Sequence, residues 1–442
     1  MKKLFGTDGI RGIAGKYPLA NDFIKKIGYV AATFLRSAEK KEFVIGRDTR
    51  ESSPALLESI SEGIVSAGMD VFDCGIISTP AIAYITVERG SSAGCVISAS
   101  HNSAEFNGIK FFSDLGIKIA DSIESKIEKE LENDFNIPDK KKGKVFNEED
   151  YAKDIYTKFL YSTIKEVTDF SGLKIVLDCA NGSNFRIAPE VFLKLKADVI
   201  TISVKPDGKN INRKCGALHI QNLKEAVLKE KANFGIAYDG DGDRCIFIDD
   251  KGEIRDGDYI IAIAAGFLKK NNILKNNSVV TTVMANFGFY KAMENEGIKV
   301  FSSAVGDKYV YEEMVNNDVI LGGEQSGHII FRDFLNTGDG LLTSLQVASI
   351  IKKSGKNLSE LSKIIKKYPQ VLLNVKVERK LPISENEKLA NAIKSVEKKL
   401  KDNGRVLVRY SGTESLLRIM VEGPDDKLIN DYSQEIAGVV DF

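Results

Sequence analysis

Short runs of β-branched and aromatic residues alternate with amphipathic stretches in the N-terminal third of the chain. A strand is predicted at Phe43–Ile45, and Ser53-Pro54 then supplies an N-cap and a first-turn proline for a helix that ends near Gly68. Further strands are expected at Val71–Cys74 and Gly94–Ser98. Strands that alternate with helices in this way indicate a mostly parallel sheet with helices on its faces.

The same order of elements recurs twice further along the chain. A second α/β unit is predicted from a helix through 188–196 and strands at 174–178, 198–204 and 234–238. A third unit begins near Asp256, with a helix that ends at Gly297 and strands at 279–283, 299–302 and 319–322. Because no strict sequence repeat accompanies this order, the similarity of the three units is inferred from the pattern of elements alone.

After Pro369 the pattern changes to a smaller α+β arrangement. Two helices and three strands are predicted there, with the lysine-rich first helix at 385–401 and the strands at 371–377, 405–410 and 416–421. A chain of 442 residues is too long for one core and suits three or four domains. We therefore expect three similar α/β domains and a C-terminal α+β domain, with boundaries at residues 1–150, 151–252, 253–368 and 369–442.

Composition and charge narrow the classes of function. Hydrophobic residues make up 43% and charged residues 28% of the chain, as in an ordinary globular protein. The 62 Lys and Arg residues balance 62 Asp and Glu residues, so no bulk positive field exists to attract nucleic acid or an anionic membrane. The longest apolar run, Tyr259–Leu268, is about half of a bilayer crossing and predicts a buried helix. Neither nucleic acid nor a membrane is an expected partner.

Cysteine usage is typical of a reducing compartment. Five cysteines are scattered through the chain without CxxC spacing, mostly in apolar surroundings: Cys74, Cys95, Cys179, Cys215 and Cys245. The apolar stretch of a secretory signal is also missing after Met1-Lys2-Lys3. We therefore expect reduced core thiols in a cytoplasmic protein.

A candidate nucleophile lies in the loop Ser98–Asn102, which follows a buried strand. The segment Asn107–Lys110 leads into the next strand, so a hydroxyl, an imidazole and an ammonium group gather at one strand end. Ser100 is a weak nucleophile unless a base, a cation or a metal assists it, and His101 and Lys110 are candidate helpers. Taken alone, these residues are also ordinary turn formers.

The segment after the predicted strand at 234–238 is a stronger candidate. Glycines separate three carboxylates at alternate positions, which can converge on a hard divalent cation such as magnesium: Asp239, Asp241 and Asp243. An EF-hand would need glycine at Arg244, glutamate at Asp250 and flanking helices, so calcium sensing is disfavoured. A solvated acidic hairpin is the alternative for this motif alone.

Other loops carry groups suited to a phosphorylated sugar. Gly322–His328 closes a strand with a carboxylate, an amide, a hydroxyl and an imidazole. Arg409–Glu414, followed by Arg418, joins two strands with hydroxyls, free amides and guanidinium groups, which is a phosphate cradle in chemical terms. Gly6–Gly12 and Gly46–Arg50 add arginines beside hydroxyls. Each segment also fits a structural role. The sequence contains neither a P-loop nor a GxGxxG motif after a strand, which argues against a nucleotide-driven kinase or a dinucleotide enzyme.

In this order and spacing, the serine, aspartate, glutamate and arginine loops resemble those of the alpha-D-phosphohexomutase superfamily, from Leu4 to Met420. The resemblance implies four domains arranged around a central cleft, each contributing one loop. The branch that acts on glucosamine phosphate is resembled by Phe5–Gly12, Ser98–Asn102, Asn210–Asn212 with Cys215-Gly216, and Gln325. The implied reaction interconverts glucosamine 6-phosphate and glucosamine 1-phosphate through a 1,6-bisphosphate, and it supplies UDP-N-acetylglucosamine for the cell wall.

Roles for individual residues follow from the motifs and the resemblance. The expected catalytic residues are Ser100, which becomes phosphorylated, His101, Lys110 and Arg244. One Mg²⁺ per subunit is expected at Ser100, Asp239, Asp241 and Asp243. Substrate binding is expected at Thr7, Arg11, Lys308, Glu324, Ser326, His328, Arg409, Ser411, Gly412, Thr413 and Arg418. The implied substrate is a phosphosugar, the implied activator a sugar 1,6-bisphosphate, and the implied assembly a homodimer.

Two positions depart from the pattern of these mutases. Ser103 stands where the serine loop typically has proline, which loosens the loop slightly. Lys308 stands where arginine is usual, which keeps the positive charge but loses bidentate geometry. A mutase for glucose or mannose phosphates and a non-catalytic regulator that binds phosphosugars are the alternative functions.

Overall fold

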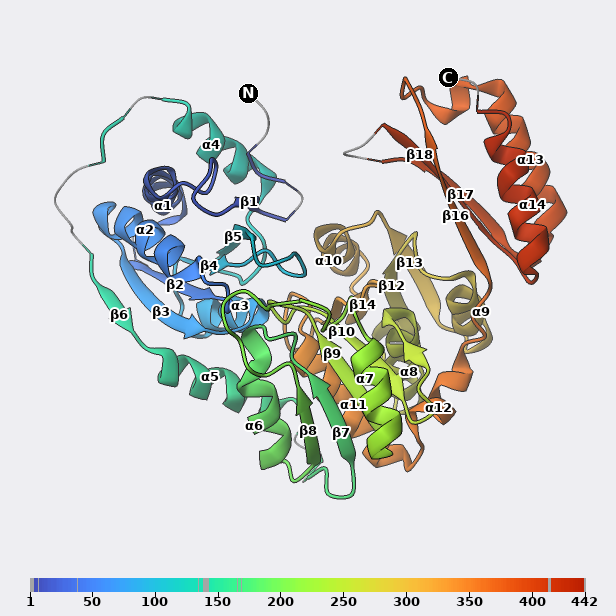
Figure 1. Cartoon of the computed structure of the whole chain (residues 1–442), viewed down its shortest axis with the longest axis horizontal. Helices are drawn as coiled ribbons and strands as arrows, with labels where there is room; N and C mark the ends of the chain where they lie inside the picture. The colour runs from blue at the N-terminus through green and yellow to red at the C-terminus, as the bar shows by residue number, and fades with distance from the viewer. Residues whose placement is uncertain are drawn as a thin grey trace. The chain divides into compact units, whose positions relative to one another are not determined.

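The computed structural model describes residues 4–6, 8–37, 39–133, 135–137, 143–164, 166–167, 169–411 and 415–440. The chain divides into two compact units, Met1–Val283 with Phe301–Ser362 and Met284–Val300 with Lys363–Phe442. The first unit is built on three sheets and the second on one (Figure 1).

A six-stranded sheet with the order β1-β5-β4-β2-β3-β6 forms the N-terminal part of the first unit. Its strands are β1 (Ile10–Ile13), β2 (Glu42–Arg47), β3 (Asp70–Ile76), β4 (Ala93–Ile97), β5 (Phe106–Ser113) and β6 (Val145–Asn147). As predicted, the sheet is mostly parallel: β4, β2, β3 and β6 are parallel, whereas β5 and β1 are antiparallel to their neighbours. The serine loop between β4 and β5 is too short for the crossover that a parallel pair requires.

Helices cover both faces of this sheet (Figure 1). On one face, β2 contributes Phe43 and Ile45 to a core shared with helices α1 (Asn21–Leu35), α2 (Ser53–Ser66) and α4 (Asp121–Leu131). On the other face, Gly46 leaves room for Ile82 of α3 (Thr79–Glu88), and α5 (Glu149–Ser162) packs beside α3. The predicted N-cap of α2 is wrong by one residue: the helix begins at Ser53, so Ser52 is at the N-cap position. The hydroxyl of Ser53 donates to Asp48 (2.9 Å).

The second sheet has the order β11-β10-β9-β7-β8. Its strands are β7 (Lys174–Asp178), β8 (Asp198–Ile202), β9 (Phe234–Tyr238), β10 (Cys245–Asp249) and β11 (Ile254–Arg255), with helices α6 (Ile187–Lys194) and α7 (Gln221–Glu230). β8, β7 and β9 are parallel, and β10 returns antiparallel to β9. The turn between β9 and β10 is the aspartate loop, residues 239–244.

The third sheet has the order β13-β12-β14-β15. Its strands are β12 (Ser278–Thr282), β13 (Lys299–Ser303), β14 (Leu321–Gly323) and β15 (Ile329–Phe331), and its helices are α8 (Gly257–Lys270), α10 (Asp307–Asn316), α11 (Gly340–Ser354) and α12 (Leu358–Leu361). The helix α9 (Phe287–Asn295) belongs to the second unit. The helix α8 is the predicted buried helix, since Tyr259 to Ala265 are all buried. β14 and β15 form a hairpin, and its turn, Glu324–His328, is the segment predicted to contact a sugar (the sugar loop).

The C-terminal sheet is antiparallel, with the order β16-β18-β17. Its strands are β16 (Gln370–Lys376), β17 (Arg405–Tyr410) and β18 (Leu416–Glu422), and helices α13 (Glu387–Leu400) and α14 (Asp426–Ala437) accompany them. Leu389 and Val396 of α13 share an apolar core with Ile419 of β18 and Ile429 of α14. The predicted α+β character of this region is confirmed.

Two further features concern the cysteines and the helices. All five cysteines are buried free thiols. None of the helices in the part of the chain that the structure describes has both the length and the apolar character that a bilayer crossing needs.

Candidate active site

Ser100 lies at the end of β4 with its hydroxyl directed at the aspartate loop. The side chain is buried, and its backbone adopts a left-handed conformation with φ +52°, which is uncommon for a residue other than glycine. Ser100 Oγ donates a hydrogen bond to Asp239 Oδ2 (2.8 Å) and lies 3.3 Å from His101 Nδ1. The structure therefore brings together a hydroxyl, an imidazole and a carboxylate from two different sheets.

A buried ion pair between Arg50 and Asp48 supports the serine loop. Arg50 and Asp48 are both fully buried, and Arg50 Nε lies 2.8 Å from Asp48 Oδ2. The guanidinium group of Arg50 also donates to the carbonyl oxygens of Ser100 (3.0 Å), Asn102 (2.8 Å) and Ser103. An arginine that donates four hydrogen bonds, one to a carboxylate and three to backbone carbonyls, fixes the path of this backbone.

The same loop is held from two further directions. Asp48 Oδ2 accepts a hydrogen bond from Ser98 Oγ (2.6 Å), which in turn accepts from the Ser100 amide (3.0 Å). From the second sheet, Asn212 Nδ2 donates to the carbonyls of Ser100 (2.8 Å) and Asn102 (3.0 Å). These bonds over-determine the backbone, so the left-handed conformation of Ser100 can persist.

The aspartate loop packs directly against the serine loop. Gly242 has φ +74°, and a Cβ atom at Gly240 would lie 2.6 Å from the carbonyl oxygen of Ser100. Only glycine fits at position 240, because any side chain would collide with that backbone. The two glycines therefore allow the three aspartates to approach the serine.

The three aspartates form a site that fits a divalent cation. Asp239, Asp241 and Asp243 are buried, and one ligand oxygen of each lies within 4.8 Å of the others. Asp241 Oδ1 and Asp243 Oδ1 are buried and accept no hydrogen bond within the described part of the chain. Oxygen atoms left in this state are expensive to bury unless a cation binds them, and three carboxylates suit magnesium.

The three carboxylates differ in the direction in which their surroundings shift the pKa. Burial, together with the charges of Asp243 and Asp241, raises the pKa of Asp239 well above its usual range. Burial and the charge of Asp241 likewise raise the pKa of Asp243. Burial alone would raise the pKa of Asp241, but the ammonium group of Lys110 and a hydrogen bond from Thr79 hold it below its usual range. The cluster thus lacks positive charge, chiefly around Asp239 and Asp243.

Lys110 is a fixed cation at this centre. From β5 its Nζ lies 3.0 Å from Asp241 Oδ2, 3.1 Å from Asp8 Oδ2 and 3.9 Å from Asp243 Oδ2. Burial would lower the pKa of Lys110, but the three carboxylates outweigh burial and raise it. Lys110 is therefore protonated at neutral pH and acts through its charge rather than by releasing a proton.

His101 is neutral at neutral pH, whereas Arg244 is charged. Burial lowers the pKa of His101 to about 4, with a further contribution from the positive charges of Arg244 and Arg11. The imidazole is neutral near pH 7 and can accept a proton at the position facing Ser100 Oγ. Arg244 stays charged, because the nearby Asp243 and Asp239 raise its pKa against the effect of burial.

Two N-terminal residues were also expected at this site. The guanidinium group of Arg11 pairs with Asp8, which also contacts Lys110, so Arg11 joins the same charge network. Thr7 lies outside the described residues.

The predicted sugar-binding residues lie on the hairpin between β14 and β15 and at the start of α10. Ser326 is exposed, and Glu324 Oε1 accepts from the amide of Gly306 (3.1 Å). His328 is buried, and its Nε2 accepts from the amide of Gly338 (3.3 Å). A backbone bridge joins His328 to Arg244, so the sugar loop is tied to the aspartate loop.

The ammonium group of Lys308 is directed at another protein side chain. Its Nζ lies 2.8 Å from Asp121 Oδ2 at the start of α4 and 3.7 Å from Glu312 Oε1 one turn along α10. Lys308 therefore bridges the first and third α/β parts of the first unit.

The predicted phosphate-binding residues belong to the second unit. Arg409 on β17 lies directly opposite Arg418 on β18. The amide of Ser411 donates to Leu416 O (2.8 Å), and Lys380 Nζ donates to the carbonyl of Ser411 (2.6 Å). Gly412 and Thr413 lie outside the described residues. Lys380 adds a cation that the sequence motif did not include.

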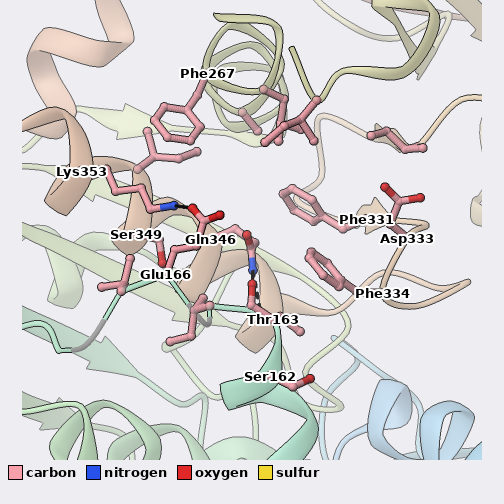
Figure 2. Close-up of a pocket in the computed structure, with 17 residues that line it drawn as sticks. Ser162, Thr163, Glu166, Phe267, Phe331, Asp333, Phe334, Gln346, Ser349 and Lys353 are labelled. Carbon is pink, nitrogen blue, oxygen red and sulfur yellow. Dashed lines mark hydrogen bonds and ion pairs between the residues drawn. The ribbon is translucent and has the colours of Figure 1, made fainter. Parts of the chain in front are cut away.

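An apolar cavity of about 250 Å³ lies away from these loops, between α8 and α11 (Figure 2). Phe267 forms part of its wall, Lys353 forms an ion pair with Glu166, and Gln346 Nε2 donates to Thr163 Oγ1 (3.1 Å). These contacts join α11 to the residues after α5. The cavity therefore belongs to packing between the second and third α/β parts and not to the candidate site.

Models of one enzyme family match the chain in the order of its sheets. The alpha/beta/alpha domains I, II and III of phosphoglucomutase/phosphomannomutase match residues 2–137, 149–252 and 256–368, and the C-terminal domain matches residues 372–439. The chain belongs to the phosphoglucomutase/phosphomannomutase family, which confirms the predicted superfamily and fold class.

Curated relatives match the whole chain. A phosphoglucosamine mutase from Caldicellulosiruptor bescii is 47% identical over 448 residues, and one from Brevibacillus brevis is 48% identical over 446 residues. Each alignment covers 100% of this chain and 99% of the relative. The prediction of a mutase, an enzyme of the isomerase class, is thereby confirmed.

A solved structure extends the likeness to the fold. An N-acetylphosphoglucosamine mutase from Aspergillus fumigatus, in complex with GlcNAc-6P and magnesium, matches with a TM-score of 0.68. The match covers 99% of this chain and 95% of that chain at 17% identity. At this identity the likeness establishes the fold alone.

Proposed function

We propose that the protein interconverts glucosamine 6-phosphate and glucosamine 1-phosphate through phosphorylated Ser100 and a glucosamine 1,6-bisphosphate. The observation that carries the proposal is Ser100 Oγ, held 2.8 Å from Asp239 in a cluster of buried carboxylates beside the cation of Lys110. Full-length relatives of 47% and 48% identity that are phosphoglucosamine mutases support the choice of sugar.

Two phosphoryl transfers complete the reaction. In the first, O1 of glucosamine 6-phosphate attacks phosphorus, the bond from phosphorus to Ser100 Oγ breaks, and the proton of O1 is transferred to a base in the site. In the second, Ser100 Oγ attacks the phosphoryl group on O6, and O6 is protonated as it leaves. Neutral His101, 3.3 Å from Ser100 Oγ, is the candidate to hold the proton between the steps.

Charge at the transferred phosphoryl group is balanced by fixed groups. Lys110 and Arg244 remain protonated and stabilise the charge on its equatorial oxygens. Mg²⁺, one per subunit and held by Asp239, Asp241, Asp243 and Ser100, would supply the further positive charge that this buried cluster lacks. Arg50 and Asn212 keep the nucleophile in place throughout.

Substrate recognition is assigned to groups outside the carboxylate cluster. Glu324, Ser326 and His328 are proposed to contact the sugar. Thr7, Arg11 and Lys308, which lie in other sequence motifs, are also proposed to bind the substrate. The phosphate that is not being transferred is proposed to bind at Arg409, Ser411, Gly412, Thr413 and Arg418. A sugar 1,6-bisphosphate is the proposed activator, because it can restore phosphorylated Ser100.

The wider setting is proposed from the same resemblance. The boundaries near residues 150, 252 and 368 are proposed to separate four domains, each of which contributes one loop. A cytoplasmic homodimer that supplies an amino-sugar phosphate for UDP-N-acetylglucosamine is the proposed context.

The test compares three substrates under one condition. Purified protein with magnesium and a trace of 1,6-bisphosphate is given glucosamine, glucose or mannose 6-phosphate, and formation of the 1-phosphate is followed. We expect the highest kcat/KM with glucosamine 6-phosphate. A preference for glucose or mannose would keep the mechanism and change the substrate, whereas no turnover by phosphorylated protein would favour a regulator.

A further inference from the structure

A pocket of about 310 Å³ lies between the serine loop and the segment that follows β8. Three cationic side chains line it, Lys209, Arg213 and Lys214, together with the imidazole rings of His101 and His219. Among the lining residues that the structure describes, Glu105 is the only carboxylate. Because the formal net charge of the whole chain is zero, this local excess does not reflect overall composition.

The backbone that carries these cations is fixed. Asn212 and Lys214 have φ values of +58° and +56°, a region that residues with side chains rarely adopt. The amide of Asn212 donates to Ala180 O (2.9 Å), and the amide of Gly216 donates to Asp178 Oδ2 (2.9 Å). Local strain that is held in this way is concentrated at ligand sites in proteins.

The pocket also adjoins the reacting serine. Asn212 Nδ2 donates to the carbonyl oxygens of Ser100 and Asn102, so one residue of the cationic segment supports the serine loop. His101 is shared, because its ring lines the pocket and its Nδ1 lies 3.3 Å from Ser100 Oγ. A ligand in the pocket would therefore lie one residue away from the nucleophile.

Two of the cations are available for a ligand. Lys209 is 3.2 Å from Glu51, which occupies it in part. The side chains of Arg213 and Lys214 are exposed, and within the described part of the chain neither side chain makes a hydrogen bond or an ion pair. A guanidinium group and an ammonium group next to each other suit a phosphate monoester, which carries close to two negative charges at neutral pH.

We infer that this basic pocket is an anion subsite that captures the phosphate group of a sugar phosphate on its way to Ser100. The inference rests on the proposed function, because it gives the pocket a part in delivering that substrate. Arg213 and Lys214 attract the dianion and raise the rate of productive encounter, without contacting the phosphoryl group during transfer. Their removal should therefore lower kcat/KM and leave kcat unchanged.

The kinetic test uses two double variants with the same change in charge. The pocket variant is Arg213→Glu with Lys214→Glu. The control variant is Lys229→Glu with Lys251→Glu, which changes two exposed lysines that do not line the pocket, one on α7 and one between β10 and β11. At about 0.02 M salt we expect kcat/KM for glucosamine 6-phosphate to fall about tenfold or more in the pocket variant and less than about twofold in the control. At about 0.5 M salt the difference should shrink to about twofold.

A binding test separates this inference from the proposed function. Inorganic pyrophosphate in magnesium-free buffer is titrated into each protein in a calorimeter, and we expect the affinity to fall about tenfold in the pocket variant alone. If wild-type protein turned over no sugar phosphate but still bound pyrophosphate through Arg213 and Lys214, the proposed function would fail and the subsite would stand. A pocket variant with the kcat/KM, salt dependence and pyrophosphate affinity of the control would overturn the subsite.

Discussion

The reacting centre and the groups assigned to recognition differ in how firmly their polar atoms are held. Ser100 is buried, and its hydroxyl, amide and carbonyl all make hydrogen bonds to protein. Ser326 on the sugar loop is exposed, and the ammonium group of Lys308 is paired with the half-exposed Asp121. The groups proposed to react are thus organised before substrate binds, whereas Ser326 and Lys308 can exchange protein or solvent partners for substrate.

Two arginines show the same contrast. Arg50 is fully buried, and its donors are satisfied by Asp48 and backbone carbonyls. Arg409 lies opposite Arg418 across two antiparallel strands, and burial together with that neighbouring charge lowers the pKa of Arg409. Like charges directly opposite each other destabilise a sheet, so an anion between them relieves the repulsion. Arg50 therefore serves the fold of the site, and Arg409 is suited to a phosphate ligand.

The largest expected effect on turnover comes from removing the hydroxyl of Ser100, compared with removing the hydroxyl of Ser326 on the sugar loop. Ser100→Ala should lower kcat by about 10⁴-fold or more, because the covalent intermediate cannot form. Ser326→Ala should raise KM by about two- to tenfold with little change in kcat, since an exposed hydroxyl contributes one hydrogen bond. Steady-state kinetics of the 1-phosphate product check both variants. Near-normal turnover by Ser100→Ala would remove the basis of the mechanism.

Replacement of each arginine by lysine is the next test. Arg50→Lys keeps the charge beside Asp48 but cannot reach the carbonyls of both Ser100 and Asn102, so kcat should fall about 10- to 100-fold with KM nearly constant. Arg409→Lys should instead raise KM about three- to tenfold with kcat nearly constant.

A stability measurement keeps the Arg50 test interpretable. Arg50→Lys could lower kcat and Tm together. Asn212→Ala is then the second variant, because it removes a hydrogen bond to Ser100 but leaves the buried ion pair of Arg50 and Asp48 in place. Asn212→Ala should lower kcat about threefold to tenfold with a small loss of stability. A loss of kcat only in variants that also unfold would indicate a purely structural role.

Much of this organisation was predictable because it is encoded in short segments. The predicted strands at 234–238 and 405–410 coincide with β9 and β17, since each is an apolar run bounded by turn residues. The four loops carry their chemistry in consecutive residues, so the sequence alone identifies Ser100 and the three aspartates as candidates. Their meeting was not derivable from local pattern, because Ser100 and Asp239 are separated by 139 positions.

The support of the serine loop was missed for the same reason. Arg50 and Asn212 reach Ser100 across 50 and 112 positions, and a sequence pattern does not specify such tertiary contacts. The signal available was an aspartate and an arginine directly after a buried strand, which the sequence left as either structural or functional. Thr79, which donates to Asp241 (2.7 Å), gave no signal, because a threonine before proline is typical of any helix start.

Magnesium should stabilise the reacting centre and leave the recognition groups unaffected. At about 100 times the dissociation constant, bound Mg²⁺ adds about 2.7 kcal/mol to the free energy of unfolding, so Tm should rise by about 2 to 6 °C. Asp243→Asn should abolish most of this rise, and Arg409→Lys should keep it. Differential scanning calorimetry with and without a chelator measures all three proteins.

Without a divalent cation, Asp243→Asn should not lower Tm relative to the wild-type protein. Burial and the charge of Asp241 raise the pKa of Asp243, so its ionised form is unfavourable in the folded protein at neutral pH. Asp243→Asn removes that charge, and in chelator its Tm should equal or exceed that of wild type. A full magnesium-dependent rise in Asp243→Asn would show that the aspartate cluster is not where magnesium stabilises the protein.

The smallest expected effect concerns the ion pair that occupies Lys308. Asp121→Asn should release the ammonium group for substrate and lower KM about two- to fivefold with kcat unchanged, because a partly exposed ion pair contributes about 0 to 1 kcal/mol. Glu312→Gln is the matched control, since Glu312 lies 3.7 Å from Lys308 and competes less. If Asp121→Asn raised KM instead, the pair would be holding the start of α10 in place for substrate, and Lys308 would belong with the firmly held groups and not with the exchangeable ones.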